Sequence, residues 1–516
     1  MKYTIAIIFF LSFACLTKAQ TDDTYAELSD SKVCNDPKAW DIVPPSPQIA
    51  WGSVDVRYAK RDAPVTPLYN NVWKTRAWRG ERINAQAVIW TKSIMTDAVV
   101  TVGDLTCRSG VIPSAAARPS FVRYVMTDEL NKDGKGACGH RPDKAEWDSS
   151  LVADVLHKAE IARIEPYTVQ PVWINVAVPG DARPGVYKGS ATVSGKDFED
   201  LKLTIEITVT DRLLPPPEEW SFHLDLWQNP YSVARYYNVP LWSDAHFEAM
   251  RPLMKQLAGA GQKVITATIM HKPWNGQTED HFDSMVSKVR NIDGRWEYDY
   301  TVFDRWVEFM MSVGIDRQIN CYTLIPWALT FDYFDKATNR MHFVETKPGE
   351  AAYRDYWGAF LKDFAAHLRS RGWFERTTIA MDERGVEAMR EAIKVIREAD
   401  PGFRISLAGN YHGEIEGDLY DYCIAYGQQF TEDVKTLRDA SGKVSTVYTC
   451  CSEARPNTFT FSPPSEAAWI GWHTASGGYG GYLRWAYNSW TSDPMRDSRF
   501  RTWAAGDCYI AYPGYS

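Results

Sequence analysis

The pattern of apolar residues changes at the three consecutive prolines 215–217, and this change divides the chain into two regions of different fold. Before the prolines, strand signals dominate and helical periodicity is nearly absent. After them, strand candidates alternate with helical segments. Three prolines in a row cannot continue a sheet and form a stiff spacer. We therefore expect a first domain over residues 20–214, a proline linker over 215–219 and a second domain over 220–516.

The first region is predicted to be an all-β domain. Its clearest strand is LKLTIEITVTD (201–211), in which apolar and polar residues alternate strictly. A period of two places the apolar side chains on one face, as in a half-buried antiparallel strand. Two further runs, VWINVAVP (172–179) and VYKGSATVSG (186–195), precede it and are separated by turn residues. Such a series of strands favours a β-sandwich-like fold.

The second region contains eight runs with the composition of buried strands. They cover residues 221–226, 263–268, 319–324, 377–381, 403–408, 422–426, 444–448 and 481–486. Amphipathic helices separate several of them. In the clearest helix, Val386, Met389, Ile393 and Ile396 recur at steps of three and four. Eight strands alternating with helices predict a (β/α)8 barrel, so the whole chain is expected to be a multidomain protein with a β domain followed by an α/β domain.

Two acidic residues, Asp382 and Glu383, stand directly after the fourth of these strands. In a β/α barrel, chemistry is carried at the C-terminal ends of the strands. Two nearby carboxylates are also the groups used in glycoside hydrolysis. The alternative is that they only cap the helix that follows, because acidic residues favour helix N-termini. Locally the two interpretations have about equal weight.

Polar and aromatic side chains gather at the other strand ends, and this favours the functional interpretation. The candidates for binding a substrate are His271, Trp274, Asn410, Tyr426, Tyr448, Arg484, Trp485 and Asn488. For any one of them alone, core packing or a surface loop is the better explanation. Together they predict an aromatic-lined cup with a carboxylate pair, which is typical of a sugar pocket. The 21 tryptophans of the chain suit this interpretation, since an indole can stack on the apolar face of a sugar ring.

Charge and motifs exclude several other classes of function. The net charge of -8 argues against binding to nucleic acid or to an anionic membrane surface. Neither a C-x-x-C pair nor an H-E-x-x-H motif occurs in the sequence, so no metal site and no cofactor are expected.

The N-terminus has the pattern of a signal peptide. Lys2 precedes an apolar run, and small residues flank the expected cleavage site after Ala19. The alternative is lipid attachment at Cys15. No later run is long enough to span a membrane, so we expect an exported protein of the periplasm or the extracellular space.

Of the nine cysteines, Cys15 lies in the leader, which leaves eight for the exported chain. In an oxidising compartment some can pair, and Cys107 with Cys138 is one possibility in the first domain. The cysteines in apolar strand-like runs are expected to be free thiols; these are Cys321, Cys423 and Cys450. The vicinal Cys450 and Cys451 are a poor disulfide pair, because adjacent residues close a strained ring.

Long segments of the chain resemble glycoside hydrolase family 123. They are the strand end at 381–383, PNTFTFSPPSEAAWIGW (456–472) and GYLRWAYNSWTSDPMRDSRFRTWAAGD (481–507). The upstream WRGERINAQAVIW (78–90) is similar to the N-terminal β domain of that family. The resemblance implies a secreted, exo-acting β-N-acetylgalactosaminidase that retains configuration by substrate assistance. Its partner would be a glycan or glycolipid with a terminal N-acetyl amino sugar.

The resemblance also implies a role for each carboxylate. In substrate assistance the 2-acetamido oxygen attacks the sugar carbon and an oxazolinium intermediate forms. Asp382 would hold the acetamido N–H and offset the charge of the intermediate, and Glu383 would protonate the leaving oxygen. The negative charge of Asp382 is expected to help keep Glu383 protonated.

Two alternatives remain open from the sequence. One is a hydrolase of another 2-acetamido sugar, such as an N-acetylglucosaminide, and the other is a non-catalytic sugar-binding protein on a degenerate barrel. The chain also departs from the family near its C-terminus. Family members continue past the equivalent of AYPG (511–514) with a further helix, so we expect a barrel that lacks its last helix.

Overall fold

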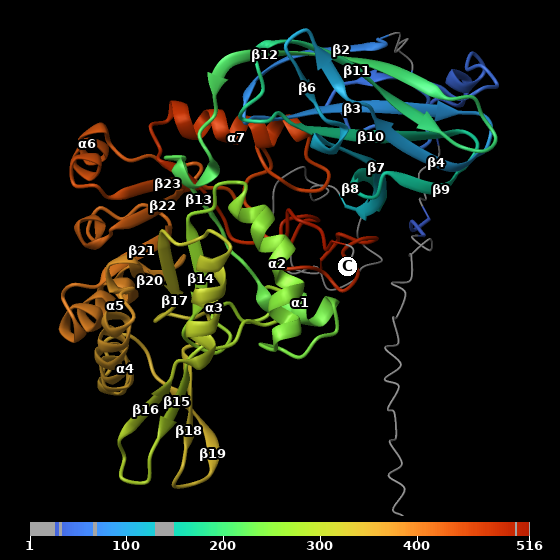
Figure 1. Cartoon of the computed structure of the whole chain (residues 1–516). Helices are drawn as coiled ribbons and strands as arrows, with labels where there is room; N and C mark the ends of the chain where they lie inside the picture. Colours follow the sequence, from blue (N-terminus) through green and yellow to red (C-terminus); the bar gives the residue numbers. More distant parts are fainter. Residues whose placement is uncertain (1–25, 30–33, 65–69, 129–148, 501–502, 515–516) are drawn as a thin grey trace, which may run out of the picture.

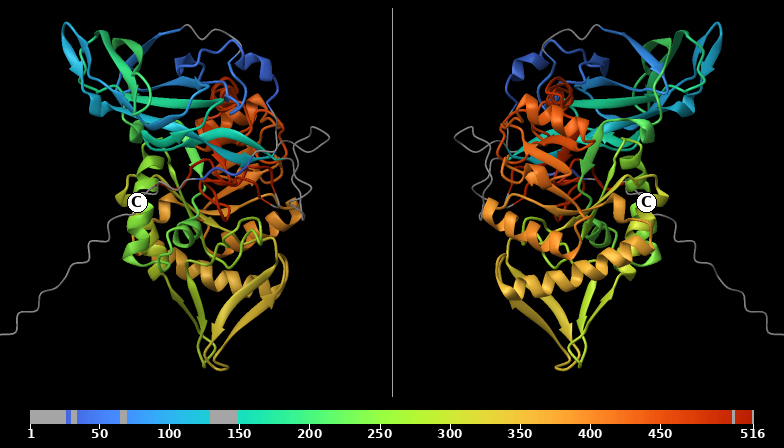
Figure 2. Two further views of the ribbon diagram at one scale, coloured as in Figure 1. Left: turned by 90° about the vertical axis from the view of Figure 1, so that its right-hand side faces the viewer. Right: turned by 90° about the vertical axis from the view of Figure 1, so that its left-hand side faces the viewer.

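The computed structural model describes residues 26–29, 34–64, 70–128, 149–500 and 503–514. The signal peptide expected at 1–19, including Cys15, lies outside these residues, as does Cys138. The N-terminal β-rich domain lies against one side of a barrel built from the second half of the chain (Figures 1 and 2).

The N-terminal domain consists of two sheets, as the alternating sequence pattern predicts. The first has the strand order β1-β3-β10-β7-β8, and the second has the order β2-β12-β11-β4-β9 with β5 and β6 beside it. The strands are β1 (Gln48–Gly52), β2 (Val72–Arg79), β3 (Arg82–Thr91), β4 (Met95–Val102), β5 (Leu105–Cys107), β6 (Gly110–Ile112), β7 (Ala117–Thr127), β8 (Ser150–Leu156), β9 (Glu160–Ile164), β10 (Thr168–Ala177), β11 (Gly185–Ser194) and β12 (Leu201–Leu213). Alternate residues of β12, such as Ile205 and Ile207, are buried with Val172 and Ile174 of β10 in one core. The strict alternation in the sequence therefore marks the face of β12 that packs against the other sheet.

The second domain is a nearly closed barrel of eight parallel strands, which confirms the predicted fold class. In chain order the strands are β13 (His223–Leu226), β14 (Val264–Thr268), β17 (Gln318–Tyr322), β20 (Thr377–Met381), β21 (Arg404–Gly409), β22 (Asp421–Ala425), β23 (Val444–Tyr448) and β24 (Gly481–Arg484). All neighbours are joined by parallel pairing except β13 and β14, which meet only at a bridge between Leu224 and Gln262. In each of the strands β14, β17 and β20 all five residues are buried, because the strands of such a barrel are covered on both faces.

Helices cover the outside of the barrel incompletely (Figure 1). They are α1 (Pro230–Tyr236), α2 (Asp244–Ala258), α3 (Thr301–Ser312), α4 (Ala351–Ser370), α5 (Val386–Ala399), α6 (Glu432–Ala440) and α7 (Pro464–Ser476). Only a 3-10 turn, Glu416–Asp418, lies between β21 and β22. No helix follows β24 in residues 485–500 and 503–514, where the chain forms turns and bridges.

A small four-stranded sheet is the main feature that the sequence did not predict. Its order is β16-β15-β18-β19, from β15 (Ser287–Arg290), β16 (Trp296–Asp299), β18 (Thr330–Asp335) and β19 (Arg340–Glu345). It projects from the barrel on the side away from the N-terminal domain (Figure 2). Its strands come from the β14–α3 and β17–α4 connections, so the two loops are joined into one layer.

The two domains contact each other through side chains and backbone. The backbone N–H of Met126 donates to the carbonyl of Arg496 (2.8 Å), and that of Ser498 donates back to the carbonyl of Met126 (2.9 Å). The hydroxyl groups of Thr127 and Thr460 lie 2.6 Å apart. β7 therefore extends its hydrogen bonding into the last segment of the barrel.

The cysteines are mostly free thiols. Cys107 is free, so the suggested pairing of Cys107 with Cys138 was wrong; its sulfur instead lies 3.3 Å from the hydroxyl of Ser109 at the turn between β5 and β6. Cys321, Cys423 and Cys450 are free as expected, and Cys451 is disulfide-bonded.

Among the described helices, none is long and apolar enough to cross a membrane.

Candidate active site

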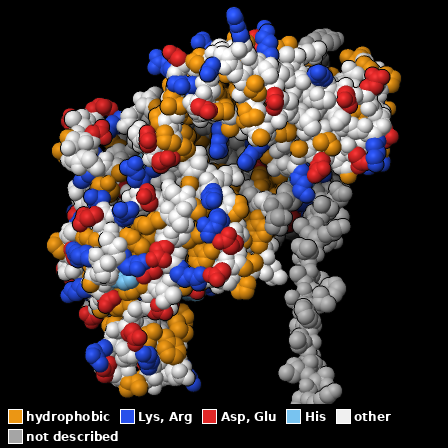
Figure 3. Space-filling view, in the orientation of Figure 1, with side chains coloured by type: hydrophobic (Ala, Val, Ile, Leu, Met, Phe, Trp, Pro, Cys, Tyr) orange, Lys and Arg blue, Asp and Glu red, His pale blue; other side chains and the backbone are white. Residues whose placement is uncertain are grey.

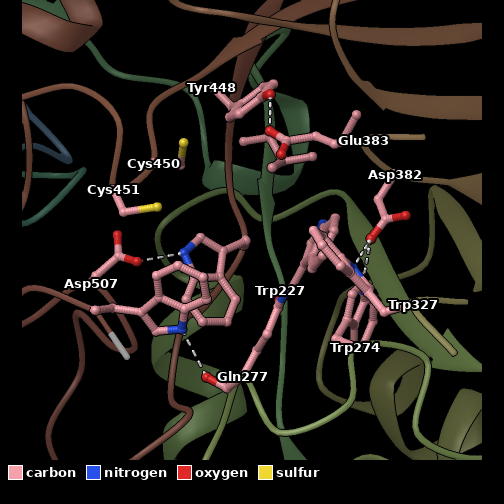
Figure 4. Close-up of a pocket in the computed structure, with 14 residues that line it drawn as sticks. Trp227, Trp274, Gln277, Trp327, Asp382, Glu383, Tyr448, Cys450, Cys451 and Asp507 are labelled. Carbon is pink, nitrogen blue, oxygen red and sulfur yellow. Dashed lines mark hydrogen bonds between the residues drawn. The ribbon is translucent and has the colours of Figure 1, made fainter. Parts of the chain in front are cut away.

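Asp382 and Glu383 lie at the C-terminal end of β20 and line a cavity of about 140 Å³ (Figure 4). Since all eight strands run parallel, the residues that follow them meet at this end of the barrel. The lining consists of Trp227, Trp274, Gln277, Trp327, Asp382, Glu383, Ala408, Tyr448, Cys450, Cys451, Leu483, Trp485, Trp503 and Asp507. Five indole rings and three carboxylates therefore line one small space.

Asp382 is held from one side only. Its Oδ2 accepts hydrogen bonds from the indole N–H of Trp274 (2.9 Å) and of Trp327 (3.2 Å). Its Oδ1 is buried and accepts no hydrogen bond from the described residues. The guanidinium of Arg384 lies 3.5 Å from that oxygen, but its Nε–H donates to the carbonyl of Ile325 (3.1 Å). This buried oxygen therefore has a cation nearby but no hydrogen-bond donor among the described residues.

Burial dominates the electrostatics of Asp382. Desolvation raises the pKa of this carboxyl from its ordinary 3.8 to about 6, and the negative charge of Glu383 adds to the effect. The positive charge of Arg384 and the two indole donors act in the opposite direction, because they stabilise the ionised form. Asp382 is therefore a carboxylate at neutral pH and an acid below about pH 6.

Glu383 has different surroundings from its neighbour. It is exposed to solvent, whereas Asp382 is 6% exposed. The hydroxyl of Tyr448, at the end of β23, donates a hydrogen bond to Oε1 of Glu383. Burial and the negative charge of Glu383 both raise the pKa of Tyr448, so this hydroxyl keeps its proton and remains a donor. Two adjacent carboxyl groups in unequal environments are the arrangement that enzymes use to assign separate roles to an acid and a charge stabiliser.

Aromatic rings form the rest of the cavity wall. Trp227 stacks on Trp274 with ring centres 5.1 Å apart, and the ring of Tyr322 packs against Trp227 with centres 4.4 Å apart. On the opposite side, Trp485 meets Trp503 edge to face at 6.0 Å. Rings fixed in this way present flat apolar surfaces on which one face of a sugar can stack.

A third carboxylate, Asp507, faces the pair across the cavity. It accepts a hydrogen bond from the indole N–H of Trp485 on Oδ2 (3.1 Å) and from the guanidinium of Arg484 on Oδ1 (2.6 Å). Arg484 is fully buried behind the wall and also donates to Asn457 (2.6 Å). Burial raises the pKa of Asp507, and the neighbouring Arg484 opposes this shift. Asp507 therefore fixes the orientation of the Trp485 ring and adds an acceptor to the cavity.

The structure brings five of the sequence-predicted residues together in the cavity: Trp274, Asp382, Glu383, Tyr448 and Trp485. The other five do not line it. Arg484 and Asn488 are buried in the framework, the latter through a hydrogen bond from its Nδ2 to the carbonyl of Asn229 (2.8 Å). His271 pairs with Asp283 (2.9 Å), Asn410 bonds Gln428 (2.6 Å), and Tyr426 packs on His473.

Several lining residues were absent from the predicted set. Trp227 and Trp327 follow the first and third strands, and their position at strand ends was the signal available for them. Gln277, Trp503 and Asp507 come from long connections, where no periodicity marks a residue as facing the site. No group of three or more metal-ligating side chains occurs in the described residues.

A barrel with adjacent carboxylates and an indole-lined cavity at its strand ends defines the protein as a barrel glycosidase. The family model for the glycoside hydrolase 123 catalytic domain matches residues 227–516, and the model for the glycoside hydrolase 123 N-terminal domain matches residues 51–195. The chain belongs to glycoside hydrolase family 123.

One solved structure agrees with this assignment. A family 123 glycoside hydrolase from Clostridium perfringens, described in terms of glycolipid glycan hydrolysis, superposes with a TM-score of 0.83 at 28% identity, covering 91% of this chain and 83% of that one. A GH5 xyloglucanase from Bacteroides ovatus gives a TM-score of 0.30 at 10% identity, covering 85% of this chain and 96% of that one. The comparison with curated proteins gave no match.

Proposed function

We propose that this glycosidase releases terminal β-linked N-acetylgalactosamine from a glycan or glycolipid, with retention of configuration and through an oxazolinium intermediate. The observation that carries the proposal is that Oδ1 of Asp382, a buried carboxylate oxygen, accepts no hydrogen bond from the described residues. A 2-acetamido N–H is the donor that such an oxygen would accept. With its N–H held, the acetamido group presents its own oxygen to the sugar carbon.

The spacing of the carboxylates supports substrate assistance over direct attack. In the ordinary retaining mechanism the two carboxylates flank the sugar from opposite sides, about 5 Å apart. Asp382 and Glu383 are consecutive at one strand end, so they approach a sugar from the same side of the barrel. In the proposed mechanism Asp382 holds the acetamido group and offsets the charge of the oxazolinium ion. Glu383, which is exposed, protonates the leaving oxygen and later activates water.

Tyr448 and the indole wall supply positioning. The hydroxyl of Tyr448 donates to Glu383 in the free protein and would turn its one proton to the acetamido oxygen as that oxygen attacks. Trp485, fixed by Asp507, would stack on the sugar face. The small cavity of about 140 Å³ favours one terminal residue over the interior of a long chain. The glycolipid context named for the Clostridium perfringens enzyme supports a glycolipid as one source of that residue.

Hydrolysis of paired 4-nitrophenyl β-N-acetylgalactosaminide and β-N-acetylglucosaminide tests the sugar. We expect turnover of the first and little of the second, whereas preference for the second would assign the glucosamine alternative. Turnover of neither, with glycan binding retained, would assign a sugar-binding protein. The 2-hydroxyl galactoside should be almost inert, and a thiazoline analogue of N-acetylgalactosamine should inhibit strongly because it mimics the intermediate.

The roles of the carboxylates have a separate test. Glu383→Gln should lose most activity on poor leaving groups and less on activated aryl glycosides, because protonation matters less there. Asp382→Asn should lose activity on both. Equal losses for Glu383→Gln on all leaving groups, or a sugar covalently bound to either residue, would refute the mechanism.

Export is also part of the proposal, since the sequence at 1–19 has the pattern of a signal peptide. N-terminal sequencing of protein recovered outside the cytoplasm should begin at Gln20. Recovery of the intact leader in the cytoplasm alone would contradict export.

A further inference from the structure

A second cavity, of about 860 Å³, lies between the N-terminal domain and the barrel. It is bounded by the outer face of the β1-β3-β10-β7-β8 sheet, by the end of α2 and by residues 510–514. In the space-filling view, Lys and Arg side chains surround a hollow between the two domains (Figure 3). The cavity shares no lining residue with the carboxylate cavity.

Polar side chains form a row across three strands on this face. Asn84 of β3 stands directly opposite Asn175 of β10, which in turn stands opposite Arg118 of β7. Two residues further along the same strands, Trp173 stands opposite Ser120. Side chains that alternate with these on the same strands pack into the sandwich core, so the row itself points away from that core.

The aromatic ring of the row is held in place. The indole N–H of Trp173 donates to Oδ1 of Asn84 (3.1 Å), and the amide of Asn175 donates to the same oxygen (2.7 Å). Trp173 remains partly exposed and Asn84 is exposed. A fixed indole flanked by planar amides can stack on a sugar and bond its hydroxyl groups, which is how carbohydrate surfaces recognise their ligands.

The charges around the row are mostly positive. Arg82, Arg118 and Lys255 line the cavity, and none of them forms an ion pair with a residue that the structure describes. The carboxylate in the lining, Asp154, is paired with Arg57 at 2.5 Å and accepts the hydroxyl of Tyr512 at 2.5 Å. Within the described part of the chain, no carboxylate lies within ion-pair distance of these guanidinium and ammonium groups, although the net charge of the whole chain is -8.

We propose that this interdomain cavity is a second carbohydrate site that binds an acidic oligosaccharide. Trp173 would stack on a sugar ring, and Asn84 and Asn175 would form hydrogen bonds with its hydroxyl groups. Arg118 would donate bidentate hydrogen bonds to the anionic group of the ligand. The volume of about 860 Å³ lies in the range of ligand pockets, and exceeds that of the carboxylate cavity, so it accommodates more than one sugar residue. The anionic group is a carboxylate, as in a sialylated glycan, or a sulfate ester.

Titration calorimetry on the full chain tests the proposal with three probes: 3′-sialyllactose, lactose 3′-sulfate and neutral lactose. None of them carries an N-acetylgalactosamine for the carboxylate cavity. We expect binding of at least one acidic probe, at least tenfold tighter than binding of lactose. Trp173→Ala and Arg118→Ala should each weaken it at least tenfold. Trp78→Ala and Arg76→Ala, exposed residues on the other sheet, serve as matched controls and should leave binding unchanged.

Absence of binding to both acidic probes, equal binding of lactose, or unchanged binding in Trp173→Ala and Arg118→Ala would each overturn the proposal. Hydrolysis of an aryl glycoside by the same variants should match the parent chain, which shows that they are folded. An inactive parent chain that still binds the acidic probe would refute the proposed hydrolysis and leave this site standing.

Discussion

Asp382 and Glu383 are neighbours in the chain but have different surroundings, and the proposed mechanism assigns them different roles for this reason. Asp382 is buried among indoles and has one oxygen free of hydrogen bonds, whereas Glu383 is exposed and its carboxylate accepts a hydrogen bond from the Tyr448 hydroxyl. A buried carboxylate oxygen without a hydrogen-bond donor costs stability, and the guanidinium of Arg384, 3.5 Å away, offsets part of that cost. In the proposed mechanism the acetamido N–H of the substrate supplies the missing donor and recovers that cost on binding.

The first prediction is that Asp382→Asn becomes more stable relative to the parent chain as the pH rises. The pKa of Asp382 is raised by burial from 3.8 to about 6, so between these values the folded state binds more protons than the unfolded state. The contribution of Asp382 to stability is therefore present below about pH 4 and is lost as the pH rises through about 6. The whole change is roughly 3 kcal/mol, and the asparagine does not titrate.

Urea unfolding of both proteins at pH 4 and pH 7.5 measures this difference. The free energy of unfolding of Asp382→Asn, relative to that of the parent chain, should increase from pH 4 to pH 7.5. Glu387→Gln, an exposed residue on α5, provides a control whose difference should be much smaller. A pH-independent difference for Asp382→Asn would contradict the raised pKa.

The second prediction concerns Tyr448. Tyr448→Phe removes one hydroxyl and should lower kcat/KM by about 100-fold, because a donor aimed at developing charge contributes on that order. Its ring packs as before, so the melting temperature should change little. Tyr426→Phe, at the end of the neighbouring strand but outside the cavity, is the matched control and should retain activity. Similar rates for both variants would show that the Tyr448 hydroxyl has no catalytic part.

At the scale of the elements, the sequence predicted those strands whose residues are all buried. Thr377–Met381 forms β20 with the predicted bounds, because an uninterrupted apolar run allows few other structures. The four-stranded sheet was missed because its strands are half polar and lie in connections. The Asp293-Gly294 pair at one of its turns was the available signal.

The site was predictable where strand geometry controls a side chain. Within the eighth strand, alternation places Leu483 and Trp485 toward the cavity and the intervening Arg484 on the other side, so period two could have excluded Arg484. His271 and Asn410 stand beyond strand ends, and there the loop sets the direction. Asp507 reaches the cavity from a connection with no periodic pattern, which only the folded chain reveals.

The third prediction concerns α5, the helix that follows the carboxylates. The apolar face of this helix includes Ile396, which is fully buried in the barrel core. Ile396→Ala should lower the free energy of unfolding by about 2–5 kcal/mol, because it removes buried methyl groups and leaves a cavity. Aryl glycosidase activity per folded molecule should stay the same, since the side chain does not reach the site.

Lys394→Ala on the exposed side of the same helix is the control. Its ion pair with Glu391 is at the surface, where such pairs contribute about 0–1 kcal/mol. Denaturant unfolding separates the two variants. Equal stability of Ile396→Ala and the parent chain would place α5 outside the cooperative core.

At the scale of the whole molecule, the N-terminal domain supports the segment that completes the carboxylate cavity. Met126 pairs through its backbone with Arg496 and Ser498, and this stretch leads to Trp503 and Asp507 in the cavity wall. The same domain forms one side of the interdomain cavity. A β domain that holds the last part of a barrel in place cannot move freely without disturbing the site, so the two domains are expected to act as one unit.

The last prediction follows from that coupling. Arg57 joins the domains: its Nη1 donates to Asp154 (2.5 Å) and to the carbonyl of Ala153 (2.9 Å), and its Nε donates to the carbonyl of Ser462 in the barrel (2.8 Å). We expect a single calorimetric unfolding transition for the parent chain. Arg57→Ala should lower the free energy of unfolding by about 1–3 kcal/mol, since it leaves partly buried acceptors without their charged donor. Lys74→Ala, whose 4.0 Å pair with Glu206 is largely exposed, should leave the transition unchanged. Two separate transitions in the parent chain would mean that the domains fold independently, and the support of the cavity by the N-terminal domain would then have to be abandoned.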